Sequence, residues 1–137
     1  RDLSMRLSAR ERTGLRAMVE LARRYGEGPI ALNEVAETQG LSLPYLERVA
    51  ASLRDAGLLS SVRGARGGYM LTRPPAEISV SDVFVAVEGN LLTVDCVCPD
   101  GSRCDREPVC ATRDVMTTVR DCLSDTLGQT TLASVIA

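Results

Sequence analysis

The stretch from residue 32 to residue 72 constrains the fold most, because it sets two helices and a hairpin in a fixed order. Apolar residues recur at helical spacing over about 33–38 and again over about 42–56, and Gly40 separates the two segments. Two short strands follow at 58–62 and 69–72, joined by a basic, glycine-rich turn. This order is typical of a winged helix-turn-helix. It predicts a mainly α fold with one small β-hairpin.

Hydroxyl residues mark the expected starts of three helices. Ser8 and Glu11 have the spacing of a capping box, as do Ser79 and Asp82. Ser42 stands where it can cap the helix that follows the Gly40 turn. A further long helix is expected over about 112–128, and the segment 130–136 is expected to add a last turn.

The long C-terminal helix is expected to begin at Thr112 and to end at Gly128. Its apolar stripe is predicted to consist of Val115, Met116, Val119, Cys122, Leu123 and Thr126. Cys122 lies on this stripe, and the pattern therefore predicts that it belongs to the core.

The charge balance divides the chain into two parts with different roles. Residues 1–73 carry 12 arginines and 8 acidic residues, a net charge of +4, whereas residues 74–137 carry 4 arginines and 10 acidic residues, a net charge of −6. A basic N-terminal part is consistent with a polyanionic partner. The Pro74–Pro75 pair is the expected linker, which predicts one unit at 5–74 and a second at 75–137.

The second helix of the N-terminal pair predicts a DNA reader. A helix fits the major groove of B-DNA and presents its first turn to base edges. Arginines on an extended hairpin turn suit the minor groove or the flanking phosphates. The candidate contacts are Ser42, Pro44, Tyr45, Glu47 and Arg48 on the helix, and Arg63 and Arg66 on the turn. The alternative is ordinary packing of two hairpins, with these arginines on a solvated face.

Composition and motifs argue against membrane proteins and enzymes. Hydrophobic residues make up 45% and charged residues 25% of the chain, which is typical of a soluble globular protein. No apolar run approaches the roughly 20 residues that span a bilayer, and the stretch RDLSMRLSARER lacks the apolar h-region typical of a signal peptide. The chain has no histidine and no nucleotide-binding motif, so no catalytic site is expected. We expect a cytoplasmic protein whose thiols stay reduced.

Four of the five cysteines fall between residues 94 and 114, where they form a candidate metal site. Cys98, Cys104 and Cys110 are separated by five residues each, and Cys96 precedes them. Thiolates are soft ligands that suit iron–sulfur clusters or zinc. A zinc site made of all four cysteines, a disulfide and free thiols are the alternatives.

Four segments of the chain carry a family resemblance. They are residues 5–30 (MRLSARERTGLRAMVELARRYGEGPI), residues 41–74 with the run GLLSSVRGARGGYML, the VEG at 87–89, and the C-x5-C-x5-C motif. Together they resemble the IscR/NsrR/CymR family of bacterial winged-helix transcription regulators. The resemblance implies a homodimer, packed through the C-terminal helix at about 112–128, that binds a roughly palindromic double-stranded operator. It also implies that the candidate DNA contacts named above read bases, backbone or minor groove.

The resemblance also implies an iron–sulfur cluster in the cysteine loop at about 95–111. In IscR-like members the three cysteines matching Cys98, Cys104 and Cys110 hold a [2Fe–2S] cluster, which is favoured here over a [4Fe–4S] cluster. Their fourth ligand, usually a histidine, lies three residues after the last cysteine, where this chain has Arg113. An arginine side chain is a permanent cation and cannot take that place.

Other residues are therefore candidates for the fourth ligand. In members that sense nitric oxide, a carboxylate from the partner's first helix ligates the cluster, and the matching position is Arg12, next to Glu11. Cys96 and Glu11 of the partner subunit are the two candidates. The cluster would make the protein a sensor of cluster status, redox state or nitric oxide. Two rivals remain: a cluster-free family regulator controlled by a partner protein or metabolite, and a zinc-stabilised interaction module.

Overall fold

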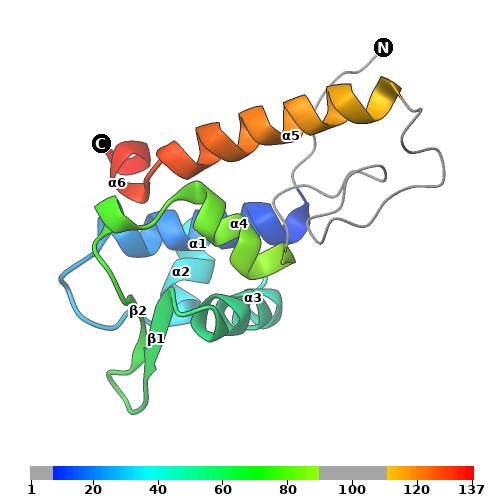
Figure 1. The fold of residues 1–137 in the computed structure, drawn as a ribbon. Coiled ribbons are helices and arrows are strands. Elements are labelled where there is room, and N and C mark those ends of the chain that lie inside the picture. The colour runs from blue at the N-terminus through cyan, green and yellow to red at the C-terminus, as the bar shows by residue number, and fades with distance from the viewer. Residues whose placement is uncertain (1–7, 90–110) are drawn as a thin grey trace.

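The computed structural model describes residues 8–89 and 111–137, apart from the side chains of residues 111–113 and 116. Its elements are α1 (Ala9–Arg23), α2 (Leu32–Gln39), α3 (Leu43–Asp55), β1 (Leu59–Val62), β2 (Gly68–Leu71), η1 (Pro75–Glu77), α4 (Val80–Glu88), α5 (Ala111–Gln129) and α6 (Leu132–Ile136). Helices α1 to α4 form one body, from which the hairpin projects on one side, and α5 lies across the opposite side (Figure 1). No described helix is long and apolar enough to cross a bilayer. The predicted winged helix-turn-helix is confirmed.

One hydrophobic core joins the apolar faces of α1, α2, α3, α4 and α6 with the hairpin. Burying a large apolar side chain stabilises a fold by roughly 1.5–3 kcal/mol. The largest fully buried side chains are Met18, Leu21, Val35, Leu46, Val49, Leu53, Ile78, Val83 and Leu132. The core thus draws on residues from both sides of Pro74–Pro75, and the division at this linker stays a prediction about separate roles.

Two of the three predicted helix caps are present. The Ser8 hydroxyl accepts from the Glu11 N–H at 3.1 Å, and the Glu11 carboxylate accepts from the Ser8 N–H at 3.3 Å. Ser79 and Asp82 make the same reciprocal pair at the start of α4, with both distances 3.0 Å. Ser42 occupies the N-cap position of α3, but its side chain makes no capping hydrogen bond, so that prediction was wrong.

The end of α3 leads directly into the hairpin. Gly57 has a φ of +85°, its N–H donates to the Arg54 carbonyl at 2.9 Å, and the Leu58 N–H donates to the Leu53 carbonyl at 3.0 Å. This pair of bonds is a Schellman motif, which ends the helix and turns the chain. Thr72, just after β2, then closes the unit: its hydroxyl donates to the Gly57 carbonyl at 2.6 Å and its N–H to the Leu58 carbonyl at 3.1 Å.

The hairpin is held to the body by a third piece of backbone. Strands β1 and β2 pair antiparallel, with Leu59 opposite Leu71. Ile30 pairs with Tyr69 on the other edge of β2, through two hydrogen bonds of 2.9 Å and 2.8 Å. Gly68 passes so close to this pairing that a Cβ atom built on it would lie 2.2 Å from the Ile30 carbonyl oxygen. Only glycine permits this approach.

Helix α5 is longer than predicted, and its stripe is not buried. Thr112 and Gly128 both lie inside the helix, because a glycine with open space around it can continue a helix at modest cost. Cys122 is exposed, which contradicts its predicted place in the core of this chain. Val115 and Val119 on the same stripe are 59% and 45% exposed. Helix α5 packs against α4, and Val115, Val119 and Cys122 are left without cover from the described part of this chain.

Candidate nucleic-acid interface

The first turn of α3 is built to leave polar groups exposed. Pro44 lies in this turn, where its missing N–H costs the helix nothing. Ser42, Pro44, Glu47 and Arg48 are all accessible to solvent, whereas Tyr45 is half-buried and packs against the hydrophobic core. Because the Ser42 hydroxyl caps nothing, it remains available to an external partner. The predicted helix residues therefore all lie at the N-cap or in the N-terminal half of α3, where four of the five are exposed.

Tyr45 and Arg48 form a pair that sequence reasoning did not identify. The guanidinium carbon of Arg48 lies 5.7 Å from the centre of the Tyr45 ring, which is a cation–π contact. Residues three apart on a helix are neighbours, so the spacing itself was the available signal. Tyr45, which packs against the core, restricts where the Arg48 guanidinium points.

The hairpin turn at residues 63–67 carries the other two predicted contacts. Arg63 and Arg66 are both exposed there. The turn depends on its glycines: Gly64 has a φ of +116°, and a Cβ on Gly67 would lie 2.1 Å from the Val62 carbonyl oxygen. The Gly67 N–H also donates to the Gly64 carbonyl at 3.0 Å. A tight turn therefore holds two arginines at the far end of the hairpin.

The arginines at these two places differ in their pairing from Arg23, Arg24 and Arg54, each of which pairs with a carboxylate. Within residues 8–89 and 111–137, Arg48, Arg63 and Arg66 make no ion pair. Arg24 on α1, by contrast, donates to Glu34 at 2.9 Å, and this bond raises the pKa of its guanidinium. Helix α3 and the hairpin lie on the side of the molecule away from α5 (Figure 1). The structure thus places three arginines and one exposed acidic residue, Glu47, without ion pairs on α3 and the hairpin turn.

Most of the candidate metal ligands lie outside the residues that the structure describes. Cys96, Cys98, Cys104 and Cys110 lie outside residues 8–89 and 111–137. Within those residues there is no cluster of three or more possible metal-ligating side chains. Glu11, the remaining candidate, is half-buried and uses its carboxylate in the α1 capping box. A ligand role for Glu11 would compete with that bond.

Comparison with known proteins settles the family. A family model described as "Rrf2: Iron-dependent Transcriptional regulator" matches residues 7–137. The chain belongs to the Rrf2 family. The resemblance inferred from the sequence is thereby confirmed.

Rrf2 proteins of two kinds are similar to this chain. The regulator CymR of Bacillus subtilis is 40% identical over 128 residues, covering 93% of this chain and 87% of that protein. The regulator IscR of Serratia proteamaculans is 36% identical over 132 residues, covering 96% of this chain and 79% of that protein.

The solved Rrf2 structures support the same fold. The structure titled "CymR (YrzC) the Global Cysteine Regulator of B. subtilis" has a TM-score of 0.81 and 38% identity, with 97% of each chain covered. The structure titled "T. potens IscR" has a TM-score of 0.79 and 38% identity, covering 98% of this chain and 88% of that one. This Rrf2 chain is therefore a DNA-binding transcription regulator and not an enzyme.

Proposed function

We propose that this Rrf2 regulator acts as a homodimer and reads operator DNA with the first turn of α3 and with the hairpin turn. The observation that carries the proposal is that Arg48, Arg63 and Arg66, three of the arginines that make no ion pair in the described part of the chain, belong to α3 and the hairpin turn. These two elements lie on the side of the molecule away from α5 (Figure 1). Unpaired cations are available to phosphates, and phosphate contacts supply much of the affinity of a DNA-binding protein. The protein acts in the cytoplasm, where bacterial DNA lies.

In the major groove, each residue of the α3 turn has its own task. Arg48, directed by the Tyr45 ring, donates to a guanine or to a phosphate. Glu47 accepts from a cytosine amino group and repels sites that place acceptors there. The Ser42 hydroxyl, which makes no capping hydrogen bond, donates to the DNA backbone or to a base. Pro44 packs against the wall of the groove. The hairpin turn places Arg63 and Arg66 in the adjacent minor groove or on the flanking phosphates.

The dimer forms through α5. Val115 and Val119 are 59% and 45% exposed on the apolar stripe of this helix, and Cys122 lies exposed on it as well. Apolar residues at this spacing pack well against a second helix. Two copies joined in this way present two α3 helices, which matches a roughly palindromic operator.

The sensor part is an iron–sulfur cluster held by Cys98, Cys104 and Cys110, with [2Fe–2S] favoured over [4Fe–4S]. The family description as iron-dependent supports the presence of iron, and three thiolates are a suitable donor set for it. The occupancy or chemical state of such a cluster would respond to iron supply, oxygen or nitric oxide. Cys96 and Glu11 of the partner subunit are the candidates for the fourth ligand.

Coupling between cluster and DNA follows from the position of the last cysteine. Helix α5 begins at Ala111, one residue after Cys110. A change in ligation at Cys110 therefore acts directly on the start of the helix that joins the two subunits. The spacing between the two α3 helices is the quantity that such a change would alter.

A second candidate is a regulator without a cluster, controlled by a partner protein or metabolite. Its support is the 40% identity to CymR, whose B. subtilis form is titled a global cysteine regulator. Arg113, where a histidine ligand is expected in IscR-like members, also favours this candidate. A zinc-stabilised form of the cysteine loop is the remaining alternative.

Two arginine variants and a matched control test the DNA contacts. Arg48→Ala and Arg63→Ala should each weaken operator binding by about 1–3 kcal/mol if the side chain reads a base, or lower the salt slope by about one if it binds a phosphate. Arg54→Ala is the control, because Arg54 lies at the other end of α3 and pairs with Asp55 at 3.5 Å. Arg63→Ala with unchanged affinity and salt slope would refute the role of the hairpin.

An absorption spectrum of anaerobically purified protein, with iron, sulfide and zinc counted on the same sample, tests the cluster. Visible bands with about two irons and matching sulfide per chain are expected. Cys96→Ala should change the spectrum if Cys96 is the fourth ligand, whereas Cys122→Ala, on the exposed face of α5, should not. A colourless protein that stays colourless after reconstitution supports the cluster-free candidate, and a colourless protein with zinc supports the zinc site.

A further inference from the structure

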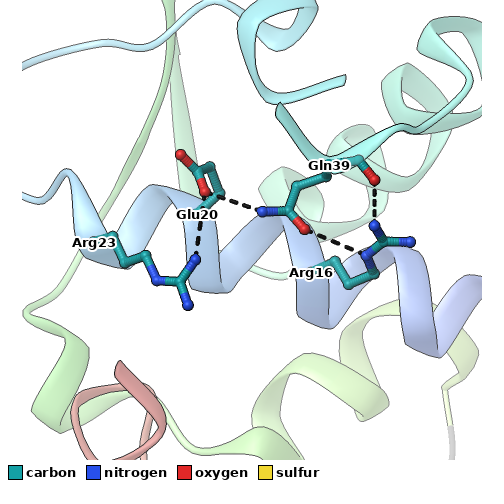
Figure 2. A network of polar contacts seen from close by, with 4 residues as sticks. All are labelled: Arg16, Glu20, Arg23 and Gln39. Carbon is teal, nitrogen blue, oxygen red and sulfur yellow. Dashed lines mark hydrogen bonds and ion pairs between the residues drawn. The ribbon is translucent and has the colours of Figure 1, made fainter. Parts of the chain in front are cut away.

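A polar network joins α1 to the last residue of α2 (Figure 2). The Gln39 amide donates to the Glu20 carboxylate at 3.0 Å, and Arg16 Nε donates to the Gln39 amide oxygen at 3.3 Å. A second Arg16 nitrogen donates to the Gln39 backbone carbonyl. Arg23 lies 3.8 Å from the same Glu20 carboxylate. Gln39 is thus bonded at its side-chain amide nitrogen, its amide oxygen and its backbone carbonyl.

Glu20 at the centre of this network is the one buried charged residue in the described part of the chain, with 8% of its surface exposed. A buried carboxylate is costly unless it is hydrogen-bonded. The Gln39 amide makes the shorter contact with the Glu20 carboxylate, at 3.0 Å, whereas the exposed Arg23 guanidinium lies 3.8 Å away. This requirement gives the side chain of Gln39 one preferred position.

Gln39 is joined to the start of α3 by a short turn, so its position affects the orientation of that helix. Gly40 follows it in the left-handed conformation with a φ of +64°, and the Leu41 N–H donates to the Ala36 carbonyl at 2.8 Å. Only residues 40–42 separate Gln39 from the first residue of α3. A shift of Gln39 is therefore passed through a short, sharply bent turn to Ser42 and the residues after it.

We infer that Gln39 is a positioning residue for operator recognition, held by Glu20 and Arg16 so that the first turn of α3 meets the bases in one orientation. The inference rests on the proposed function, because it takes α3 as the reading helix. Gln39 itself touches no base. Loss of its bonds to α1 lowers the preference for operator over unrelated DNA, while the non-specific affinity, which depends on phosphate contacts, is kept.

The chemistry of the pair allows a test by exchange of the two side chains. Gln39→Glu places two carboxylates where a 3.0 Å hydrogen bond now stands, so they repel one another. Glu20→Gln keeps the bond, because an amide oxygen can still accept from Gln39. The double variant Glu20→Gln/Gln39→Glu reverses donor and acceptor, and it leaves a carboxylate that can accept from Arg16.

The measurement is the ratio of operator to non-specific affinity for each full-length variant. The operator is the duplex that wild-type protein selects from a randomised pool, and the non-specific DNA is a shuffled duplex of the same length. Gln39→Glu should lower the ratio about tenfold, Glu20→Gln by less than about twofold, and the double variant should return to within about twofold of wild type. Glu37→Gln, which makes the charge change of Glu20→Gln at an exposed position on α2, is the control and should leave the ratio unchanged.

The outcomes separate this inference from the proposed function. Wild-type protein that selects no sequence refutes DNA reading by α3 and the inference with it. Wild-type selection together with an unaltered ratio in Gln39→Glu, or a double variant no better than Gln39→Glu, overturns the inference alone. If circular dichroism shows that Gln39→Glu does not fold, Gln39→Ala replaces it, and an unaltered ratio in that variant overturns the inference equally.

Discussion

Replacing Gly68 by alanine should detach the hairpin from the body of the protein. A Cβ at this position would lie 2.2 Å from the Ile30 carbonyl oxygen, 2.3 Å from its carbonyl carbon and 2.8 Å from the Ala31 nitrogen. All three atoms belong to the backbone, so no side chain can rotate away. The strand must therefore move outward, and the two hydrogen bonds between Ile30 and Tyr69 are lost.

The cost can be worked out from those contacts. Each backbone hydrogen bond contributes about 0.5–1.5 kcal/mol, and local backbone distortion of this kind costs about 1–3 kcal/mol. Gly68→Ala should therefore lower the free energy of unfolding by about 2–6 kcal/mol. Because the hairpin turn carries Arg63 and Arg66, operator affinity should fall as well.

Urea denaturation at one fixed protein concentration measures the change, because a dimer unfolds in a concentration-dependent way. Gly128→Ala is the matched control. Gly128 lies inside α5, and a Cβ added there would meet no neighbouring group within 4 Å, so alanine should stabilise the helix by about 0.5–1 kcal/mol. Gly68→Ala with an unfolding free energy within about 0.5 kcal/mol of wild type would refute the close approach between β2 and Ile30.

Three further changes test other parts of the molecule. Leu53→Ala removes a fully buried side chain and should cost about 2–5 kcal/mol in urea denaturation; a smaller loss would contradict its burial. Ser79→Ala should cost about 0.5–2 kcal/mol because it removes a capping bond, whereas Ser42→Ala, which caps nothing, should be close to neutral; equal effects would contradict the assignment. Val119→Asp on the exposed α5 stripe should shift the protein from dimer to monomer in analytical ultracentrifugation, and an unchanged dimer would place the interface elsewhere.

Local signals in the sequence predicted the fold well. The capping boxes at Ser8 and Ser79 act within a few residues of themselves, so their effects can be read without the rest of the chain. The order of helix, turn, helix and hairpin follows from such signals. Thr112 and Gly128 were misread, because a helix boundary also depends on what surrounds it, and nothing near Gly128 opposes a helix.

The candidate site could be predicted only in part. The exposed arginines were identified from their positions, since an exposed helix turn and a hairpin turn are both local features. The link between Glu20 and Gln39 joins residues 19 positions apart on different helices, and no periodicity reveals such a contact. Cys122 was assigned to a core because an apolar stripe looks the same whether it is covered by its own chain or by a second one.

The junction between α3 and the hairpin determines which segment must be exchanged to give this protein a different operator specificity. The Schellman motif at Gly57 and the two hydrogen bonds from Thr72 connect the end of α3 to both strands of the hairpin, so residues 42–72 form one hydrogen-bonded unit. The α3 turn proposed to read the major groove begins this stretch, and the hairpin turn with Arg63 and Arg66 lies in its second half. A graft intended to give this protein another operator should therefore transplant the whole stretch, because the residues that join α3 to the hairpin, Gly57, Leu58 and Thr72, lie outside α3.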